Sequence, residues 1–223
     1  MTIKVNLYRT FKKDKRVSME VYSDYLDFYI KKNHSSVIDI SSFKPSTLIS
    51  KFLFKSLSMR FARYVEYPYQ IKKIQRRYDI NHIVDHGYSH LIRYPLNRKN
   101  TIVTVHDLIP LLTWKGLIPN YNYPHRPRLF EYSIKFLRKA AHVIADSKNT
   151  KKDLIKHCDL KDENISVIYL GCGKSFKPLP KNQKEKLRKE KFKFPEDSFL
   201  ILITGIAYKN HETALKVLRE LRN

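Results

Sequence analysis

The chain has 223 residues, of which 42% are hydrophobic, so a packed core is expected, and its formal net charge is +23. No apolar run reaches the roughly 20 residues that span a bilayer, and the N-terminus lacks the apolar region of a signal peptide. The two cysteines, Cys158 and Cys172, are too few for a disulfide framework or a zinc site. We therefore expect a soluble, reduced, cytoplasmic protein and no bound metal.

The positive charge fits three interpretations. Lysine and arginine side chains could neutralise the phosphates of a nucleic acid, or attract the chain to an anionic membrane surface. They could also reflect a compositional bias in which lysines simply solvate the surface. Net charge informs about partners rather than about fold. No RNA-recognition or helix-turn-helix signature is present, so a nucleic-acid partner is the least favoured. A peripheral position at the inner face of the plasma membrane stays open.

Apolar periodicity along the chain predicts strands and helices in turn. Strands are expected at 2–8, 37–40, 101–105, 143–145 and 165–170, and residues 82–86 are expected to form a strand that runs into a loop. Helices are expected from about Ser18 to 30, over 47–77, over 128–141 and over 151–157. Either Ser147 or Thr150 can cap the last of these helices. Such alternation favours an α/β fold in which helices cover both faces of a mostly parallel sheet.

Residues 177–195 differ in composition from the rest of the chain. Prolines flank a run of mostly lysine and glutamate, which is typical of a solvated connector or a surface helix. We therefore expect a domain boundary there. Residues 1–176 would form the first domain, 177–195 a basic linker, and 196–223 the start of a second domain.

The last part of the chain carries a strand, a turn and a helix pattern. An apolar run at 199–203 breaks at Gly205, and Lys209 and Asn210 lead into helical periodicity over 214–221. A lysine at a helix N-terminus is a favourable place for a phosphate. One strand and one helix cannot bury a core, so we interpret this part as the opening unit of an incomplete domain.

Polar residues follow three of the predicted strands, where ligands of an open parallel sheet bind. They are Asp85, His86, Tyr88 and His90 in the loop 85–90, the pair His106-Asp107, and Gly205 through Asn210. Together these groups could orient a hydroxyl acceptor and hold a diphosphate leaving group. Each one alone has a plainer interpretation, because a His-Asp pair is commonly a loop staple and a lysine at a helix start is commonly plain surface.

In their order along the chain, these residues resemble the retaining glycosyltransferases of family 4. The resemblance rests on five segments: 103–110, 138–147, 150–154, 165–171 and 205–210. It covers 80–223 well and 1–79 loosely. It implies the GT-B fold, in which two Rossmann-like domains face each other across a cleft. It also implies transfer of a sugar from a nucleotide-sugar donor to a hydroxyl acceptor, as in polysaccharide or glycolipid synthesis.

The resemblance also implies roles for single residues. His106 would lie against the donor sugar beside the scissile bond, with Asp107 in the same loop, and we expect these two to be catalytic. The loop with Asp85, His86, Tyr88 and His90 would line the acceptor pocket. Lys209 would bind the donor diphosphate, with Gly205 and Asn210 at the same turn. No cofactor is expected, because the nucleotide-sugar is a substrate and the departing phosphate can itself take the acceptor's proton.

Three departures from the family pattern affect this interpretation. The loop after the first strand has no glycine, Ile206 stands where an arginine is frequent, and the family's paired-glutamate motif would lie beyond Asn223. We therefore expect a truncated enzyme that is inactive or weak as this chain. The alternative hypothesis is a non-catalytic acceptor domain that needs a separate donor-domain subunit, and a basic nucleic-acid-binding protein is the least favoured.

Overall fold

The computed structural model describes residues 2–52, 55–119, 121, 127–173, 176–195 and 209–221. Its centre is a six-stranded sheet in the order β2-β1-β3-β4-β5-β6, and every neighbouring pair is parallel. The strands are β1 (Ile3–Tyr8), β2 (Ile38–Phe43), β3 (Ile80–Ile83), β4 (Thr101–Val105), β5 (His142–Ala145) and β6 (Ile165–Val167). The predicted α/β, Rossmann-like parallel sheet is confirmed.

Eight α-helices lie in the described residues. They are α1 (Val17–His34), α2 (Lys55–Phe61), α3 (Tyr67–Ile71), α4 (Ile109–Trp114), α5 (Arg128–Ile134), α6 (Lys148–Cys158), α7 (Lys181–Lys186) and α8 (His211–Glu220). The short helix α4 has no counterpart among the sequence predictions. The predicted helix over 128–141 is shorter, because α5 continues only as a 3₁₀ segment over Lys135–Lys139.

The prediction of one helical region over 47–77 is wrong in detail. The structure divides it into a 3₁₀ turn, α2, a π-helical turn over Ala62–Glu66, α3 and a second 3₁₀ turn. Pro68, at the start of α3, has no N–H to donate to the preceding turn. The wider π turn lies directly before it, where the regular hydrogen-bond ladder is interrupted.

The two faces of the sheet carry separate apolar cores. On one face, Tyr22, Leu26 and Ile30 of α1 pack against a small cluster formed by Val5, Leu7, Ile40 and Val84. The opposite face carries the larger cluster, which includes Tyr8, Ile83, Val103, Val105 and Leu137. Leu7 and Tyr8 belong to different clusters because successive side chains of a strand point to opposite faces.

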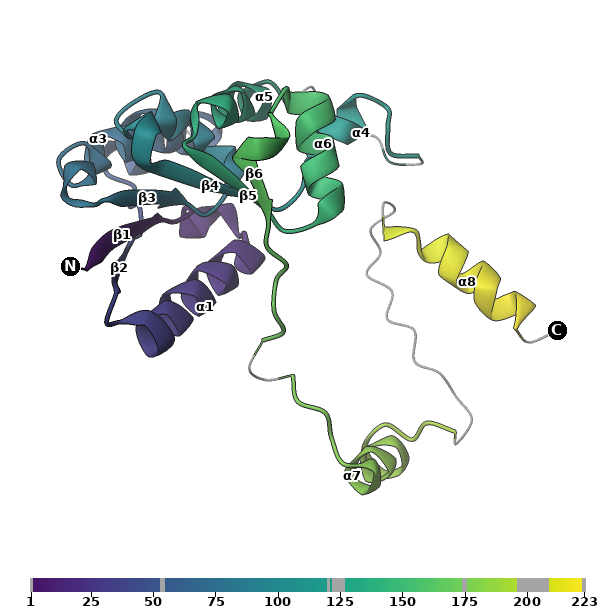
Figure 1. The fold of residues 1–223 in the computed structure, drawn as a ribbon. Coiled ribbons are helices and arrows are strands. Elements are labelled where there is room, and N and C mark those ends of the chain that lie inside the picture. The colour runs from purple at the N-terminus through teal and green to yellow at the C-terminus, as the bar shows by residue number, and fades with distance from the viewer. Residues whose placement is uncertain are drawn as a thin grey trace.

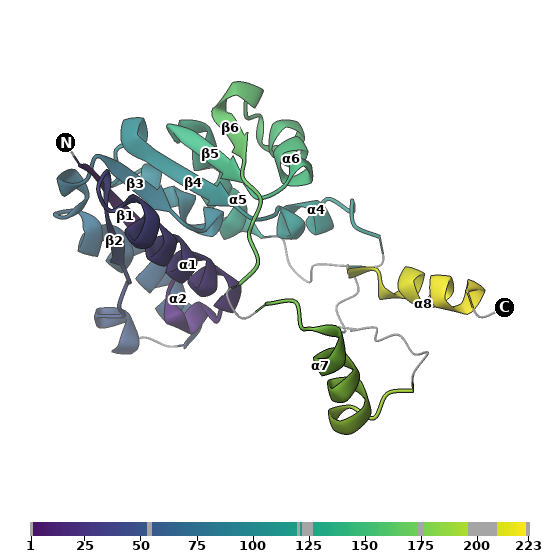
Figure 2. The same ribbon diagram turned by 60° about the horizontal axis from the view of Figure 1, so that its bottom comes forward.

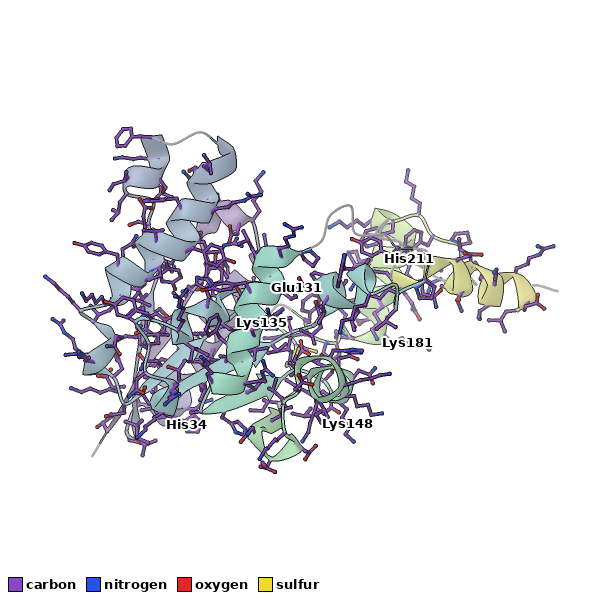
Figure 3. The ribbon with its side chains drawn as sticks, turned by 90° about the horizontal axis from the view of Figure 1, so that it is seen from above. His34, Glu131, Lys135, Lys148, Lys181 and His211 are labelled. Carbon is purple, nitrogen blue, oxygen red and sulfur yellow. The ribbon has the colours of Figure 1, made fainter. Side chains whose placement is uncertain are left out.

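Helices therefore cover both faces of the sheet. Figure 1 shows α1 on one side of the strands and α3 and α5 on the other. Figure 3 looks onto the second side, where Glu131 and Lys135 mark α5 and its continuation and Lys148 marks the start of α6. No helix within the described ranges is long and apolar enough to cross a bilayer.

The helices α7 and α8 lie apart from the sheet in both ribbon views (Figures 1 and 2). The expected surface helix within 177–195 is present as α7, which has no buried residue. The predicted helix near 214–221 is present as α8. The predicted strand at 199–203 and Gly205 lie outside the described residues. The domain boundaries at 176 and 195 stay predictions.

Candidate active site

Polar side chains gather beyond the carboxyl ends of β3 and β4. Strand β1 pairs with β2 on one side and β3 on the other, so the chain changes direction between β1 and β3, where open sheets bind ligands. A cavity of about 430 Å³ lies there, lined by residues 15–19 at the start of α1 and by Asp85, His86, His106 and Asp107. We call it the smaller cavity. Four of the predicted site residues, Asp85, His86, His106 and Asp107, thus line the same cavity.

Asp85 is held in its ionised form by Arg16. The two side chains form an ion pair, and Asp85 also accepts a hydrogen bond from the Gly87 N–H at 2.8 Å. Burial raises the pKa of Asp85, but the Arg16 charge and the hydrogen bonds outweigh it and leave the pKa below its ordinary value. A Cβ at Gly87 would lie 3.1 Å from Asp85 Oδ1 and 3.2 Å from Arg16 Nη1. Glycine therefore leaves room for this pair.

His106 has an oxygen acceptor at each ring nitrogen. Its Nε2 lies 3.0 Å from the carbonyl oxygen of Val84, and its Nδ1 lies 3.5 Å from Asp146 Oδ2. Burial lowers the pKa of His106, but the contacts to Asp146 and Val84 outweigh it and raise the pKa above its ordinary value. The ring of Tyr22 packs against the imidazole at a centroid distance of 5.1 Å. These contacts therefore shift the equilibrium of His106 toward the imidazolium.

Asp146 is itself held by the start of α6. The Thr150 hydroxyl lies 3.1 Å from both Asp146 Oδ1 and the His106 carbonyl oxygen. Ser147 is the residue that caps α6, because its hydroxyl accepts the Thr150 N–H at 3.0 Å. The cap therefore fixes the carboxylate that faces His106.

Asp107 and His86 differ in how their polar atoms are engaged. Asp107 Oδ1 accepts the Ile109 N–H at 3.0 Å, which fixes the carboxylate at the wall of the smaller cavity and begins α4. His86 packs against Phe130 at 5.3 Å, and its Nδ1 has no hydrogen-bond partner among the described residues. Burial lowers the pKa of His86, so this imidazole is neutral.

Tyr88 and His90 point into the interior and do not line the smaller cavity. Tyr88 donates its hydroxyl hydrogen to Asp14, and His90 contacts the Arg63 carbonyl oxygen at 3.0 Å. Burial lowers the pKa of His90 to about 4. The 3₁₀ helix His86–Ile92 is wholly buried, which explains why half of this loop faces the core. The acceptor-binding role of Tyr88 and His90 stays a prediction.

Lys209 and Asn210, which are predicted to bind the donor phosphate, are not among the lining residues of the smaller cavity. Lys209 and Asn210 precede α8, as predicted, and Asn210 has a left-handed backbone (φ 56°). Its Oδ1 accepts the Thr213 hydroxyl at 2.8 Å. Gly205 lies outside the described residues, and the phosphate-binding role of this segment stays a prediction.

Two residues of the site escaped the sequence reasoning. Asp146 directly follows β5, so the same rule that selected His106 could have found it. Arg16 is not among the predicted site residues, because nothing local links it to Asp85, which lies 69 positions away. Within the described ranges, no group of three or more His, Cys, Asp or Glu side chains is arranged to hold a metal ion.

A parallel sheet with a polar cavity beyond its carboxyl ends, at the switch point, defines a ligand-binding α/β domain. The chain belongs to Glycosyltransferase Family 4, whose family model matches residues 40–172, more than half of its length. That span includes the end of β2, all of β3 to β6, and the residues His86, His106, Asp107 and Asp146. This is therefore a glycosyltransferase-type domain, with a sugar donor and an acceptor as its substrates in general. A search of curated proteins finds no match.

Proposed function

We propose that this domain supplies the acceptor side of a retaining glycosyltransferase of the GT-B type. The enzyme would move a sugar from a nucleotide-sugar to a hydroxyl group of a glycan or lipid-linked acceptor at the cytoplasmic side of the membrane. The observation that carries the proposal is the smaller cavity, where His106 and Asp107 lie together beyond β4. Family membership supports the reaction class.

His106 serves as a fixed positive charge in this proposal. Both of its ring nitrogens face oxygen atoms, and Asp146 favours the imidazolium, so the ring is poorly suited to act as a general base. Negative charge develops on the departing nucleoside diphosphate. A preorganised cation at the cavity wall lowers the free energy of that transition state.

Asp107 orients the acceptor hydroxyl. Of the two carboxylates that line the smaller cavity, Asp85 is engaged by Arg16, whereas no ion pair of Asp107 is found within the described residues. The hydroxyl donates a hydrogen bond to Asp107 and attacks the anomeric carbon. The bond from that carbon to the diphosphate oxygen breaks, and the departing diphosphate takes the hydroxyl proton.

The donor side is proposed on the resemblance alone. Lys209, Asn210 and Gly205 would bind the diphosphate from a second Rossmann-like unit that begins after the basic linker. That unit would complete the cleft either within one polypeptide or as a separate subunit. The reaction would need no metal, and it would serve polysaccharide or glycolipid assembly.

The test is a transfer assay in which the chain is combined with a second, donor-binding unit, with tritiated UDP-, GDP- and ADP-sugars as donors and a glycolipid extract as acceptor. We expect His106→Ala and Asp107→Asn to lower transfer by about 100-fold, within the range for loss of one preorganised group. Asp39→Asn, an exposed carboxylate on β2, is the matched control and should be unchanged. The anomeric configuration of the product, read by NMR, tests retention.

Two outcomes would overturn the proposal. Equal transfer by Asp107→Asn and wild type would remove the role of this carboxylate. Acceptor binding without transfer from any donor, even when the second unit is supplied, would favour the alternative of a non-catalytic acceptor-binding domain.

A further inference from the structure

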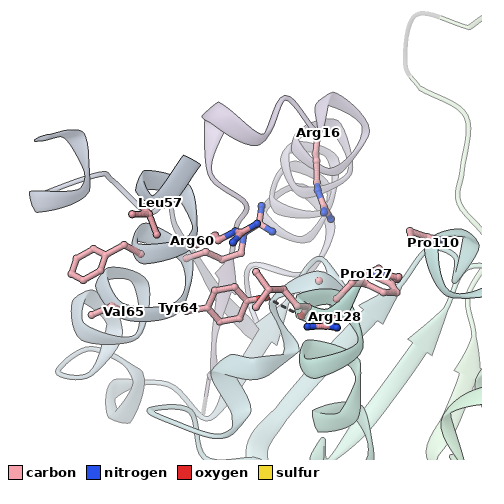
Figure 4. Close-up of a pocket in the computed structure, with 13 residues that line it drawn as sticks. Arg16, Leu57, Arg60, Tyr64, Val65, Pro110, Pro127 and Arg128 are labelled. Atoms are coloured by element: carbon pink, nitrogen blue, oxygen red, sulfur yellow. Dashed lines mark hydrogen bonds between the residues drawn. The ribbon is translucent and has the colours of Figure 1, made fainter. Parts of the chain in front are cut away.

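A second, larger cavity of about 1000 Å³ adjoins the smaller one. The two share Arg16, Pro110 and Phe130 as lining residues. The larger cavity extends from these residues between α2, the π turn over Ala62–Glu66 and the start of α5 (Figure 4). The two cavities therefore adjoin, and Asp107 lines the smaller one.

The larger cavity carries surplus positive charge. Four arginines line it, and none of its described lining residues is acidic. Arg16 is paired with Asp85, and Arg63 is paired with Asp14 at 2.6 Å. No acidic partner of Arg60 or Arg128 is found within the described residues.

Figure 4 shows Arg16 extending into the cavity from α1's side, Arg60 from α2, and Arg128 at the base, at the start of α5. Arg60 and Arg128 are both exposed, so their guanidinium groups are accessible to a ligand. In addition, the Nε of Arg63 is buried and has no hydrogen-bond partner within the described part of the chain. Guanidinium groups bind phosphate and carboxylate oxygens in a bidentate manner, so this arrangement suits an anion.

The walls of the same cavity are largely apolar. Apart from the arginines they consist mostly of Leu57, Phe61, Val65, Pro110, Pro127, Leu129 and Phe130. Leu57, Val65 and Leu129 are 56%, 50% and 41% exposed, which leaves apolar surface for a ligand to cover. A purely ionic ligand would leave these side chains in water.

Tyr64 makes the cavity a preformed one. Its hydroxyl donates to the Leu129 carbonyl oxygen at 3.0 Å and lies 3.1 Å from the Ser133 hydroxyl. These contacts tie the π turn to α5 across the cavity. The backbone segments that carry Arg60 and Arg128 are thereby joined, which reduces the ordering that ligand binding requires.

We propose that the acceptor is an amphiphile whose anionic group, a phosphate or a carboxylate, binds Arg60 and Arg128 while its apolar part covers Leu57, Val65 and Leu129. Its reacting hydroxyl then extends past the shared residues Arg16, Pro110 and Phe130 to Asp107. The assignment of the ligand as the acceptor rests on the proposed function. The anionic and apolar character of the ligand rests on the cavity itself.

The experiment measures binding by calorimetry to the whole 223-residue chain without a sugar donor. The probes are decyl phosphate, decanoate, uncharged decyl glucoside and inorganic phosphate, each below its micelle concentration. We expect the two charged amphiphiles to bind at least about tenfold more tightly than the glucoside or inorganic phosphate. The ratio of decyl phosphate to decanoate identifies the anionic group.

Two sets of variants test the two halves of the cavity. The double variant Arg60→Gln with Arg128→Gln should weaken the binding of decyl phosphate by about tenfold or more. The control variant, Arg76→Gln with Arg98→Gln, removes two exposed arginines that precede β3 and β4. It should change the affinity for decyl phosphate by less than about twofold. The double variant Leu57→Asn with Val65→Asn should weaken the binding of decyl phosphate but leave the binding of inorganic phosphate unchanged.

Three results would overturn the inference. The first is equal affinity for decyl glucoside and decyl phosphate, and the second is an equal loss of decyl phosphate affinity in the control variant. The third is displacement of decyl phosphate by UDP or GDP at similar concentration. The last result would assign the arginines to the nucleotide donor. Failure of the proposed function is distinguishable, because tight binding of decyl phosphate without sugar transfer would leave the amphiphile site in place.

Discussion

His106 and Asp146 face each other across the carboxyl ends of β4 and β5, with Nδ1 of the imidazole 3.5 Å from Oδ2 of the carboxylate. The two residues follow neighbouring strands directly, so the sheet itself sets their separation. Thr150 holds the second oxygen of Asp146, and Val84 occupies the second nitrogen of His106. The imidazole is thus fixed in orientation and biased toward its charged form.

Replacing Asp146 by Asn should lower the pKa of His106, because the charge that favours the imidazolium is removed. A group whose folded pKa is raised stabilises the protein at low pH, and this contribution is lost as pH rises through that pKa. The variant should therefore lose stability below about pH 6.5 but not near pH 9. NMR titration of the His106 ring protons and urea unfolding at both pH values measure the two effects.

The same variant should lower sugar transfer by about tenfold, with a shifted pH profile, because Asp146 positions His106 without touching substrate. Asp153→Asn, on α6, is the control. An unchanged His106 titration in Asp146→Asn would show that the carboxylate has no electrostatic role.

His82 should make the fold sensitive to acid. It is buried between β1 and β4 with its Nε2 2.8 Å from the Thr104 hydroxyl, and burial lowers its pKa to about 4. The unfolded chain takes up this proton near pH 6.5, so stability is present above that pH and falls as pH drops toward 4. The expected loss between pH 7 and pH 5 is about 2 kcal/mol.

His82→Gln keeps a nitrogen near Thr104 but does not titrate, so it should lose less stability over the same pH interval. Denaturant unfolding at the two pH values checks this. His34→Gln, at the exposed end of α1, serves as the control. The same pH dependence in His82→Gln and wild type would contradict the assignment.

Glu66 should stabilise the interrupted helical region. Its carboxylate accepts the Ser50 and Leu48 N–H groups at 2.7 and 3.2 Å and the Ser50 hydroxyl at 2.6 Å. Burial raises the pKa of Glu66, but these hydrogen bonds outweigh it and lower the pKa overall. Glu66→Gln keeps only one acceptor oxygen, so it should lower the free energy of unfolding by about 1–3 kcal/mol at neutral pH.

A carboxylate with a lowered pKa contributes stability above its unfolded pKa, and that contribution is lost as pH falls. The difference between wild type and Glu66→Gln should therefore shrink below about pH 4. Thermal and urea unfolding over this range measure it, with the exposed Glu163→Gln as control. A difference that does not depend on pH would argue against an ionised Glu66.

Leu154 and Ile155 offer a matched pair on α6. Leu154 has no exposed surface in the larger core, whereas Ile155 is 38% exposed. Leu154→Ala should cost about 2–5 kcal/mol through lost burial and a residual cavity. Ile155→Ala should cost less than about 1 kcal/mol. Urea unfolding compares the two variants, and equal losses would contradict the deeper burial of Leu154.

The sequence by itself predicted the α/β class, the six strands and the place of the polar edge. Strand and helix periodicity are local properties, because each depends on which residues of a short segment face the core. His106 and Asp107 could be selected for the same reason, since they directly follow a strongly apolar strand. The sequence offered Ser147 or Thr150 as the N-cap of α6, and the structure shows that it is Ser147.

Only the tertiary structure decided which side chains of the loops meet. It turned Tyr88 and His90 into the core, paired Arg16 with Asp85, and placed Asp146 against His106. It also divided the region 47–77 at the turn before Pro68, which shapes one wall of the larger cavity. These contacts join residues far apart in the chain, so their geometry depends on how the strands and helices pack, whereas a periodic pattern records only which face of its own segment is buried.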